Sequence, residues 1–300
     1  MEPGGPSGSP ETGRRGPEGS GGIGMGHDTA QTPNLSFGRD GAPGRGTPYA
    51  QYARLEELHG LQHPLSEEPS ELSFIVTTQV MELLFDLLRH EWTLALRALR
   101  EDDLTAALAA LRRGAHTQDV LVESWDLLAT MTPREFNSFR SLFGEASGFQ
   151  SSAFLHLEFL LGNRNAALLK MYDGMPRTQA ELTETLRSPG LYDEALALLA
   201  RRGLAPRRTP TEERYQPSAE VEAAWRRVYT EPEFAGLQPL GEALLDVAER
   251  VTRWRQRHLS TVKRTMGAKP GSGGSSGLAW LRRSAEQDVF PELWTIRDGL

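Results

Sequence analysis

Apolar residues recur at intervals of three or four along several stretches of the chain. From Leu72 to Leu99 the recurring positions are Val76, Val80, Leu84, Leu88, Trp92, Leu96 and Leu99. This spacing places side chains on one face of a helix, so it predicts a long helix whose stripe faces the core. Further helical stretches are predicted at 104–111, 120–131, 154–161, 178–187, 191–202 and 218–229.

The residues Thr132-Pro133-Arg134-Glu135 predict the start of another helix. They combine a Thr cap, a Pro at the first helical position and a Glu three residues after the cap. Phe136 and Arg140 follow four residues apart, so they share a helix face. Two interpretations of Arg140 remain open, since its guanidinium either reaches solvent or binds a buried carboxylate.

The last long helix is expected from about 237 to 266. Its apolar stripe is Leu240, Leu244, Val247, Val251 and Trp254, and the next position at this spacing is His258. A histidine on an apolar face is either a hydrogen-bonded core residue or, with a neutral imidazole, a candidate axial ligand of a haem iron. The surrounding basic residues predict a mostly solvated face, with one or two available to haem propionates: Arg250, Arg253, Arg255, Arg257, Lys263 and Arg264.

No stretch shows the alternation of a β-strand, which predicts an all-α fold. Composition then limits where this fold begins. The chain has 300 residues and 30 Gly, of which 14 lie in the first 47 residues together with six Pro. Such a segment buries too little apolar surface to offset its ordering entropy. We therefore expect a disordered tail over 1–47 and one α-helical domain over 48–300.

The chain contains no Cys, which excludes thiolate nucleophiles, iron–sulfur clusters and Cys-ligated zinc. Any metal must therefore be held by His or carboxylates. The net charge of −7 argues against a nucleic-acid partner. The sequence shows no signal pattern and no apolar run near the roughly 18 residues of a membrane span, so we expect a cytoplasmic protein without a membrane partner.

Residues 267–277 form a Gly/Ser-rich segment with five Gly. Its backbone N–H groups resemble a phosphate cradle, but no strand precedes it and no Gly-Lys-Ser/Thr ending follows. A phosphate site is therefore disfavoured. The segment is either a mobile loop that closes over a ligand or a flexible connector.

Four motifs together resemble the haem-dependent tryptophan 2,3-dioxygenase family. In chain order they are FIVTTQVMEL at 74–83, SGFQS at 147–151, FLLGN at 159–163 and GSGGSSG at 271–277. The resemblance covers about residues 48–298. Four motifs in the same order are far more specific than any one of them.

The resemblance implies an all-helical homotetramer with b-type haem that adds dioxygen across the indole C2–C3 bond of L-tryptophan, giving N-formylkynurenine. His258 matches the axial haem ligand, and Trp125 and Ser147 match positions beside the haem. Arg140 matches the Arg that pairs with the substrate carboxylate. The other pocket positions that the resemblance implies are Phe74, Thr78, Phe136, Ser272, Tyr49, Tyr52 and Ala53. Ser272 lies at the amino-acid end of the substrate, and the two Tyr reach a neighbouring subunit's site.

The chain also departs from the family pattern. Thr78 replaces the usual distal His, Phe136 replaces a Tyr, Ala53 replaces a larger Leu, and Pro69-Ser70-Glu71 replaces a His-Asp-Glu. A Thr hydroxyl can accept a hydrogen bond from the indole N–H, but it cannot act as an imidazole base.

These changes favour the divergent family branch that forms 2-oxindoles by monooxygenation, as in maremycin biosynthesis, with β-methyltryptophan as substrate and an electron donor. In that reaction Thr78 is the candidate catalytic residue. The alternative is N-formylkynurenine formation from L-tryptophan. A third hypothesis is a haem-binding sensor that has lost turnover.

Overall fold

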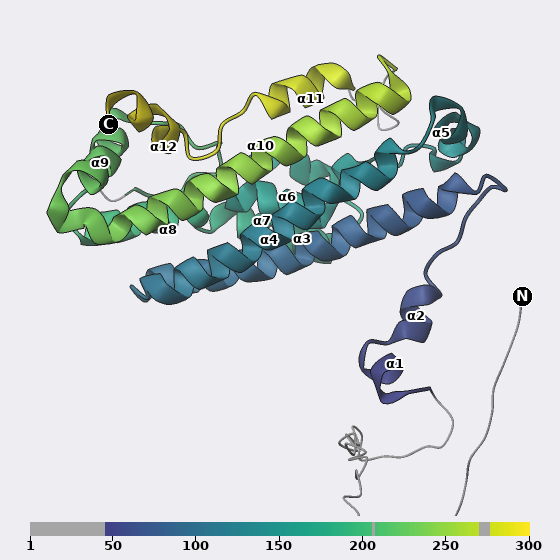
Figure 1. Ribbon diagram of the computed structural model, residues 1–300, viewed down its shortest axis with the longest axis horizontal. Helices are drawn as coiled ribbons and strands as arrows, with labels where there is room; N and C mark the ends of the chain where they lie inside the picture. The colour runs from purple at the N-terminus through teal and green to yellow at the C-terminus, as the bar shows by residue number, and fades with distance from the viewer. Residues whose placement is uncertain (1–45, 206–207, 270–276) are drawn as a thin grey trace, which may run out of the picture. The chain divides into compact units, whose positions relative to one another are not determined.

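The computed structural model describes residues 46–205, 208–269 and 277–300 (Figure 1). These residues divide into two compact units, 46–58 and 59–300. The first unit holds α1 (Pro48–Tyr52) and most of α2 (Leu55–His59). Thr47 caps α1 by accepting a hydrogen bond from the Ala50 backbone N–H. The tail predicted over 1–47 lies almost wholly outside the described residues.

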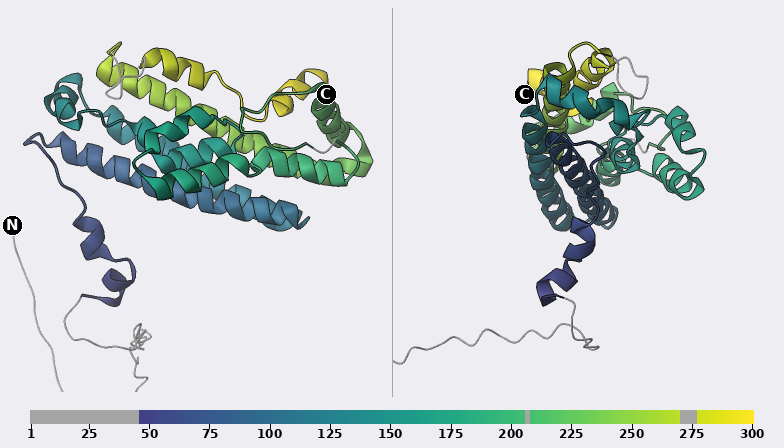
Figure 2. Two further views of the ribbon diagram at one scale, coloured as in Figure 1. Left: turned by 180° about the vertical axis from the view of Figure 1, so that it is seen from behind. Right: turned by 90° about the vertical axis from the view of Figure 1, so that its right-hand side faces the viewer.

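Three long helices form the frame of the second unit (Figures 1 and 2). They are α3 (Ser70–Arg100), α4 (Leu104–Ala129) and α10 (Gln238–Met266), and α4 packs against both of the others. In the described part of the chain no strand is formed, which confirms the all-α prediction. No helix among these residues is both long and apolar enough to span a membrane.

The helix α4 is continuous, whereas the sequence pattern predicted separate stretches at 104–111 and 120–131. Gly114 lies between those stretches, at a close approach to α3. A Cβ atom there would lie 3.2 Å from Trp92 Nε1 and 3.3 Å from Leu88 Cδ1, so a larger residue would push the helices apart. The apolar spacing is interrupted at Gly114 because the α4 backbone lies close to the Trp92 ring here, which leaves no room for an apolar side chain.

Shorter helices cover the frame; the bounds of α6 to α9 agree with the sequence pattern to within a few residues, and α5 begins at the predicted cap, whereas α11 and α12 were not predicted. They are α5 (Pro133–Phe139), α6 (Ser152–Leu160), α7 (Pro176–Arg187), α8 (Leu191–Arg201), α9 (Ala219–Thr230), α11 (Leu278–Ala285) and α12 (Pro291–Thr295). Short 3-10 helices lie between or after them: η1 (Arg140–Phe143), η2 (Gly148–Gln150), η3 (Ala166–Tyr172), η4 (Pro232–Leu237) and η5 (Ile296–Gly299).

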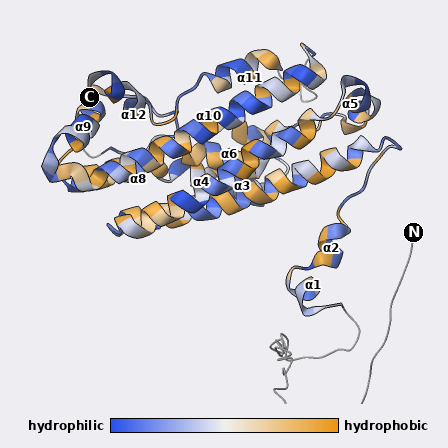
Figure 3. Ribbon diagram, viewed as in Figure 1, coloured by the Kyte–Doolittle hydropathy of each residue, from blue (hydrophilic) through white to orange (hydrophobic). Residues whose placement is uncertain are grey.

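Apolar and polar residues alternate along α3 (Figure 3), and burial of its apolar side chains differs from the predicted stripe. The C-terminal half agrees, since Leu88, Trp92 and Leu99 are all buried. In the N-terminal half the prediction is wrong, because Val76 and Val80 are 39% and 37% exposed while Thr77 and Met81 face the core. The exposed apolar side chains continue along one side of the helix and are Leu72, Val76, Val80, Leu83 and Leu87, called the α3 stripe below.

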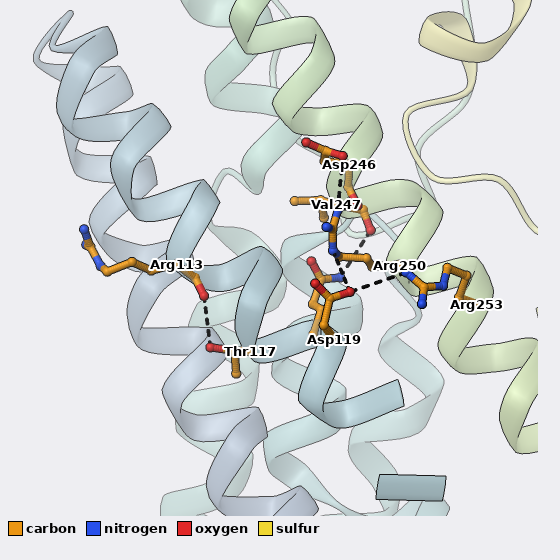
Figure 4. Close-up of polar contacts among 8 residues, drawn as sticks. Arg113, Thr117, Asp119, Asp246, Val247, Arg250 and Arg253 are labelled. Carbon is orange, nitrogen blue, oxygen red and sulfur yellow. Dashed lines mark hydrogen bonds and ion pairs between the residues drawn. The ribbon is translucent and has the colours of Figure 1, made fainter. Parts of the chain in front are cut away.

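Charged and polar contacts join α4 to α10 midway along both helices (Figure 4). Arg250 donates to Asp119 at 3.0 Å and to Asp246 at 3.1 Å, and Arg253 lies 3.4 Å from Asp119. Beside them, Gln118 Nε2 donates to the Val247 carbonyl at 3.2 Å. The basic residues of α10 are therefore not a plain solvated face, because several of them hold the helix against α4.

Candidate haem and substrate site

His258 lies on α10 in a group of aromatic rings. Its imidazole stacks on Trp125 of α4, with ring centroids 4.3 Å apart and an interplanar angle of 14°. Trp254, one turn earlier on α10, meets the imidazole edge-on at 5.4 Å. Trp254 in turn stacks on Phe154 of α6 at 5.1 Å. Packing of α4 and α6 on α10 thus brings together rings that are far apart in the sequence.

The imidazole of His258 is held in its neutral form. Burial in this aromatic setting lowers the pKa of His258 from 6.5 to about 4. A neutral imidazole has a free nitrogen lone pair, which is what a metal ion requires of a histidine ligand. The residue therefore fits the axial position that the family resemblance implies for it.

Four buried polar groups on α10 and α4 have no hydrogen-bond partner, and two of them belong to the Trp rings that contact His258. They are the indole N–H groups of Trp125 and Trp254 and the hydroxyls of Thr261 and Thr265. Buried polar groups in native proteins are nearly always hydrogen-bonded, so such a set indicates a site for a polar ligand group. A haem meets this description, because it combines an apolar ring with an iron and two carboxylates. The residues present fit this cofactor.

The second part of the site is a cluster of Phe rings where α3 meets α5 and η1. Phe74 of α3 stacks on Phe143 at 4.9 Å and meets Phe136 at 5.8 Å. The capping box predicted at Thr132 is present: Thr132 Oγ1 accepts from the Glu135 N–H, and the Glu135 carboxylate accepts from the Thr132 N–H. This cap fixes the start of α5 and with it the position of Phe136.

Arg140 lies at the point where α5 ends and η1 begins. Its side chain is partly buried, so it is neither fully solvated nor enclosed. The helix α5, which ends directly before Arg140, contacts both α3 and α10, the helices of Phe74 and His258. Phe136, four residues before it, is 8% exposed and offers no polar group.

Thr78 lies on α3, one turn after Phe74, and is exposed. Its hydroxyl donates a hydrogen bond to the Phe74 carbonyl at 2.8 Å. Because the hydroxyl proton is used within the helix, the oxygen remains available only as an acceptor. Thr78 is therefore suited to receive an N–H bond and unsuited to donate a proton.

The SGFQS motif forms a tight turn that is tied to α3. Ser147 caps η2 and shares a capping box with Gln150. Ser151 Oγ donates to Glu82 Oε2 at 3.0 Å and accepts from the Phe154 N–H at the start of α6. Burial, with a smaller contribution from nearby Asp86, raises the pKa of Glu82, although its bond to Ser151 opposes this. Glu82 was not singled out by sequence, and it holds the turn that carries Ser147.

Arg255 is a second residue whose role the sequence did not indicate. It was expected on the solvated face, which is wrong, because it is 3% exposed. Its guanidinium binds both carboxylate oxygens of Glu158 at 2.9 Å and donates to the Ser284 and Gln287 carbonyls. Arg255 stands four residues after Val251 on the apolar stripe, and this spacing was the signal available in the sequence.

Several predicted site residues lie outside the unit that carries this site or outside the described residues. Ser272 lies outside the described residues, as does the Gly/Ser segment except at its ends. Tyr49, Tyr52 and Ala53 belong to the unit of residues 46–58, where all three are exposed. Their roles in substrate binding stay predictions.

A small cavity lies in the core beside this site. It has a volume of about 40 Å³ and is bordered by Trp92, Gln118, Trp254 and Arg255, among others. Such a volume holds water molecules at most and cannot accept a haem or an amino acid. Within the described residues no cluster of three or more His, Asp or Glu side chains could hold a metal ion.

Comparisons with known proteins identify the family of this chain. Residues 28–213 and 210–300 match the tryptophan 2,3-dioxygenase family. The tryptophan 2,3-dioxygenase of Caulobacter vibrioides is 42% identical over 257 residues, which cover 84% of this chain and 98% of the relative. That of a Polaromonas species is 40% identical over 279 residues, covering 91% and 92%. That of a Bradyrhizobium species is 44% identical over 257 residues, covering 84% and 92%. The chain therefore belongs to the tryptophan 2,3-dioxygenase family and is a haem-dependent tryptophan oxygenase.

Proposed function

We propose that this enzyme adds both atoms of dioxygen across the indole C2–C3 bond of L-tryptophan, giving N-formyl-L-kynurenine. The observation that carries the proposal is the neutral imidazole of His258, stacked on Trp125 among unpartnered buried polar groups. The names of the relatives support the same reaction. The haem supplies the iron that binds and activates dioxygen, and the protein supplies the rest of the site.

Each residue of the proposed site has a distinct part in this reaction. His258 holds the iron. Arg140 pairs with the substrate carboxylate, because its planar guanidinium meets two oxygens at once. Phe74 and Phe136 provide an apolar wall for the indole, and Thr78 accepts the indole N–H bond, since its own proton is already donated to Phe74. Ser147 lies on a turn fixed by Glu82 and borders the haem.

The second candidate function is monooxygenation to a 2-oxindole, with L-tryptophan or β-methyl-L-tryptophan as substrate. It is favoured by the chemistry of Thr78 and Phe136, which supply neither an imidazole base nor a phenol hydroxyl. In this reaction one oxygen atom enters the product and the other leaves as water. Two electrons are then required from an external donor, whereas dioxygenation requires none overall.

Turnover under ¹⁸O₂ with product mass spectrometry separates these functions. We expect L-tryptophan to give N-formylkynurenine carrying two labelled atoms, without continuous supply of reductant. A 2-oxindole with one labelled atom, formed in proportion to added reductant, would replace the first proposal by the second. Absence of both products from the haem-loaded enzyme would instead support a sensor. β-Methyl-L-tryptophan, assayed in parallel, identifies the substrate.

The same family resemblance leads us to propose a homotetramer. The α3 stripe supports it, because Leu83 is 58% exposed and Leu72 is 47% exposed on an otherwise well-packed helix. An apolar row of this length on the surface is typical of a protein–protein contact.

Light scattering is expected to give four times the 33.2 kDa subunit mass. Leu83→Glu is expected to lower the measured mass, with the exposed Glu123→Gln on α4 as control. A wild-type mass of one subunit would contradict the proposal. The cytoplasmic location and the absence of a nucleic-acid partner stay predictions.

A further inference from the structure

The cavity of about 40 Å³ lies where α3, α4, α6 and α10 meet. Three residues on its border carry a buried polar atom that has no hydrogen-bond partner among the described residues. These atoms are Trp92 Nε1, Gln118 Oε1 and Arg255 Nε. The three residues are 1%, 4% and 3% exposed, so bulk solvent does not reach them. A polar atom buried this deeply without a partner is destabilising, which indicates that something in the cavity binds there.

Trp92 of α3 lies against the face of α4 that carries Gln118. A Cβ atom at Gly114 would lie 3.2 Å from Trp92 Nε1, so the indole N–H is next to the α4 backbone at this position. Gln118 follows Gly114 by four residues, which places the two on the same face of the helix. The N–H of Trp92 and the side chain of Gln118 are therefore about one helical turn apart.

Gln118 also connects this face of α4 to α10. Its Nε2 donates to the Val247 carbonyl at 3.2 Å, which fixes the orientation of the amide and leaves Oε1 as the unpartnered acceptor. Val247, Val251 and Arg255 follow one another at four-residue spacing, so they share one face of α10. The amide of Gln118 and the guanidinium of Arg255 are therefore placed along the same face of this helix.

Arg255 is paired at both of its terminal nitrogens but not at Nε. One terminal nitrogen binds both carboxylate oxygens of Glu158 at 2.9 Å, and the other donates to the Ser284 and Gln287 carbonyls. A buried ion pair offsets its desolvation only when its remaining N–H groups also find acceptors. No acceptor within the described residues serves the Nε–H, so a ligand in the cavity has to supply one.

The three atoms select a ligand that both accepts and donates hydrogen bonds. Trp92 Nε1 and Arg255 Nε carry protons and need an acceptor, whereas Gln118 Oε1 needs a donor. A small anion can accept but would be repelled by the Gln118 oxygen, and an apolar ligand can do neither. Water does both, and at roughly 10–15 Å³ each the cavity has room for about three water molecules.

We propose that the cavity holds ordered water that accepts hydrogen bonds from Trp92 Nε1 and Arg255 Nε and donates one to Gln118 Oε1. Water is then a structural part of the joint between the four helices. Trp254 also borders the cavity, and its ring meets the imidazole of His258 edge-on at 5.4 Å. The hydrated cavity thus lies beside a ring that contacts the proposed haem ligand. The inference does not depend on the reaction that the enzyme catalyses.

The test is a crystal structure of the haem-loaded enzyme at a resolution that shows ordered solvent. We expect a water peak in the cavity within about 3.2 Å of Trp92 Nε1, Arg255 Nε and Gln118 Oε1, or two linked peaks that share these contacts. Crystals soaked in bromide are expected to show no anomalous peak there, and crystals under xenon pressure no xenon. A bromide peak would show an anion site and a xenon peak a dry apolar cavity. Either peak, or a cavity without density, overturns the proposal.

Two variants of α4 test the part that Gln118 plays. Gln118→Met removes the acceptor at nearly unchanged volume, so the water bound to it is expected to lose at least half of its occupancy. Thr117→Val removes the neighbouring buried hydroxyl, which donates to the Arg113 carbonyl at 3.1 Å and does not border the cavity. This control is expected to keep the water at its wild-type position and occupancy. The same occupancy in Gln118→Met as in the wild type would contradict the bond to Gln118.

Discussion

His258 and Arg140 are placed by different physical means. His258 is held by ring packing, because Trp125 covers one face of the imidazole and Trp254 meets its edge. Arg140 is placed by the backbone, since it follows a capped helix and begins a 3-10 turn. The first arrangement surrounds the imidazole with aromatic rings, and the second sets a partly buried guanidinium at the end of α5.

At the residue scale, Arg140→Ala is expected to weaken L-tryptophan binding by roughly 30-fold or more, about 2 kcal/mol. Binding of 3-methylindole, which lacks the carboxylate, is expected to change much less. Titrations followed by the haem absorption spectrum measure both affinities. Arg134→Ala removes an exposed Arg of the preceding helix α5 and serves as the control. Equal losses for the two ligands would contradict a carboxylate pair.

At this scale the sequence indicated that His258 extends an apolar stripe and that Arg140 shares a face with Phe136. It could not indicate the stack on Trp125, which depends on how α4 packs against α10. Nor could it indicate that the Thr78 hydroxyl donates to Phe74, since that depends on the side-chain rotamer.

At the element scale, the cap of α5 controls the substrate end of the site. Thr132→Ala removes one half of the capping box and is expected to lower the free energy of unfolding by about 1 kcal/mol. Because α5 carries Phe136 and leads into Arg140, affinity for L-tryptophan is expected to fall several-fold as well. Chemical denaturation and haem-monitored titration measure the two effects. Unchanged affinity in a destabilised variant would show that the cap is separate from the site.

The ion pair of Arg255 and Glu158 joins α10 to α6. Arg255→Met leaves a largely buried carboxylate without its partner and is expected to cost roughly 3–5 kcal/mol of stability. The double variant Arg255→Met with Glu158→Leu is expected to recover most of this loss, because it removes both charges. Urea denaturation measures each variant.

Arg257 offers a matched control for Arg255 two residues away on α10. It pairs with Asp126, but both side chains are largely exposed, so Arg257→Met is expected to cost less than about 1 kcal/mol. Equal costs at 255 and 257 would contradict the structural role of the Arg255 pair. The contrast also explains why the run of basic residues was hard to interpret from sequence. Arg residues that are neighbours on the same helix lie in different surroundings.

At the scale of the whole molecule, most helices could be predicted because their apolar spacing is regular. The prediction failed at Val76 and Val80, which are exposed although they continue the stripe of α3. Apolar spacing shows which residues share a face, but it cannot distinguish a face that meets the core from one that stays exposed on the subunit. It also missed the continuity of α4, since Gly114 interrupts the pattern without interrupting the helix.

Acid sensitivity is a second property of the whole molecule. His156 is buried between α6 and α7 beside Thr185, and burial, together with nearby Arg89, lowers its pKa from 6.5 to about 4. The unfolded chain therefore binds more protons than the folded chain between these values, and stability falls as the pH drops from about 6.5 towards 4. For His156 this loss amounts to roughly 3 kcal/mol at pH 4.

The haem-free protein is the form in which to measure this effect, because acid release of haem would otherwise add to it. In this form His258 contributes to the same slope, since its pKa is similarly lowered. The melting temperature of the haem-free protein is expected to fall between pH 7 and pH 5. His156→Gln is expected to reduce the slope of this dependence, because Gln does not titrate while His258 still does. The same slope in that variant would show that other groups carry the acid sensitivity.

The most direct test of the account is the absorption spectrum of His258→Ala after reconstitution with haem and gel filtration. The wild type and His116→Ala, which changes an exposed His of α4, are expected to retain a full Soret band. His258→Ala is expected to lose it, with its far-ultraviolet circular dichroism unchanged. A Soret band of wild-type position and intensity in His258→Ala would contradict the account.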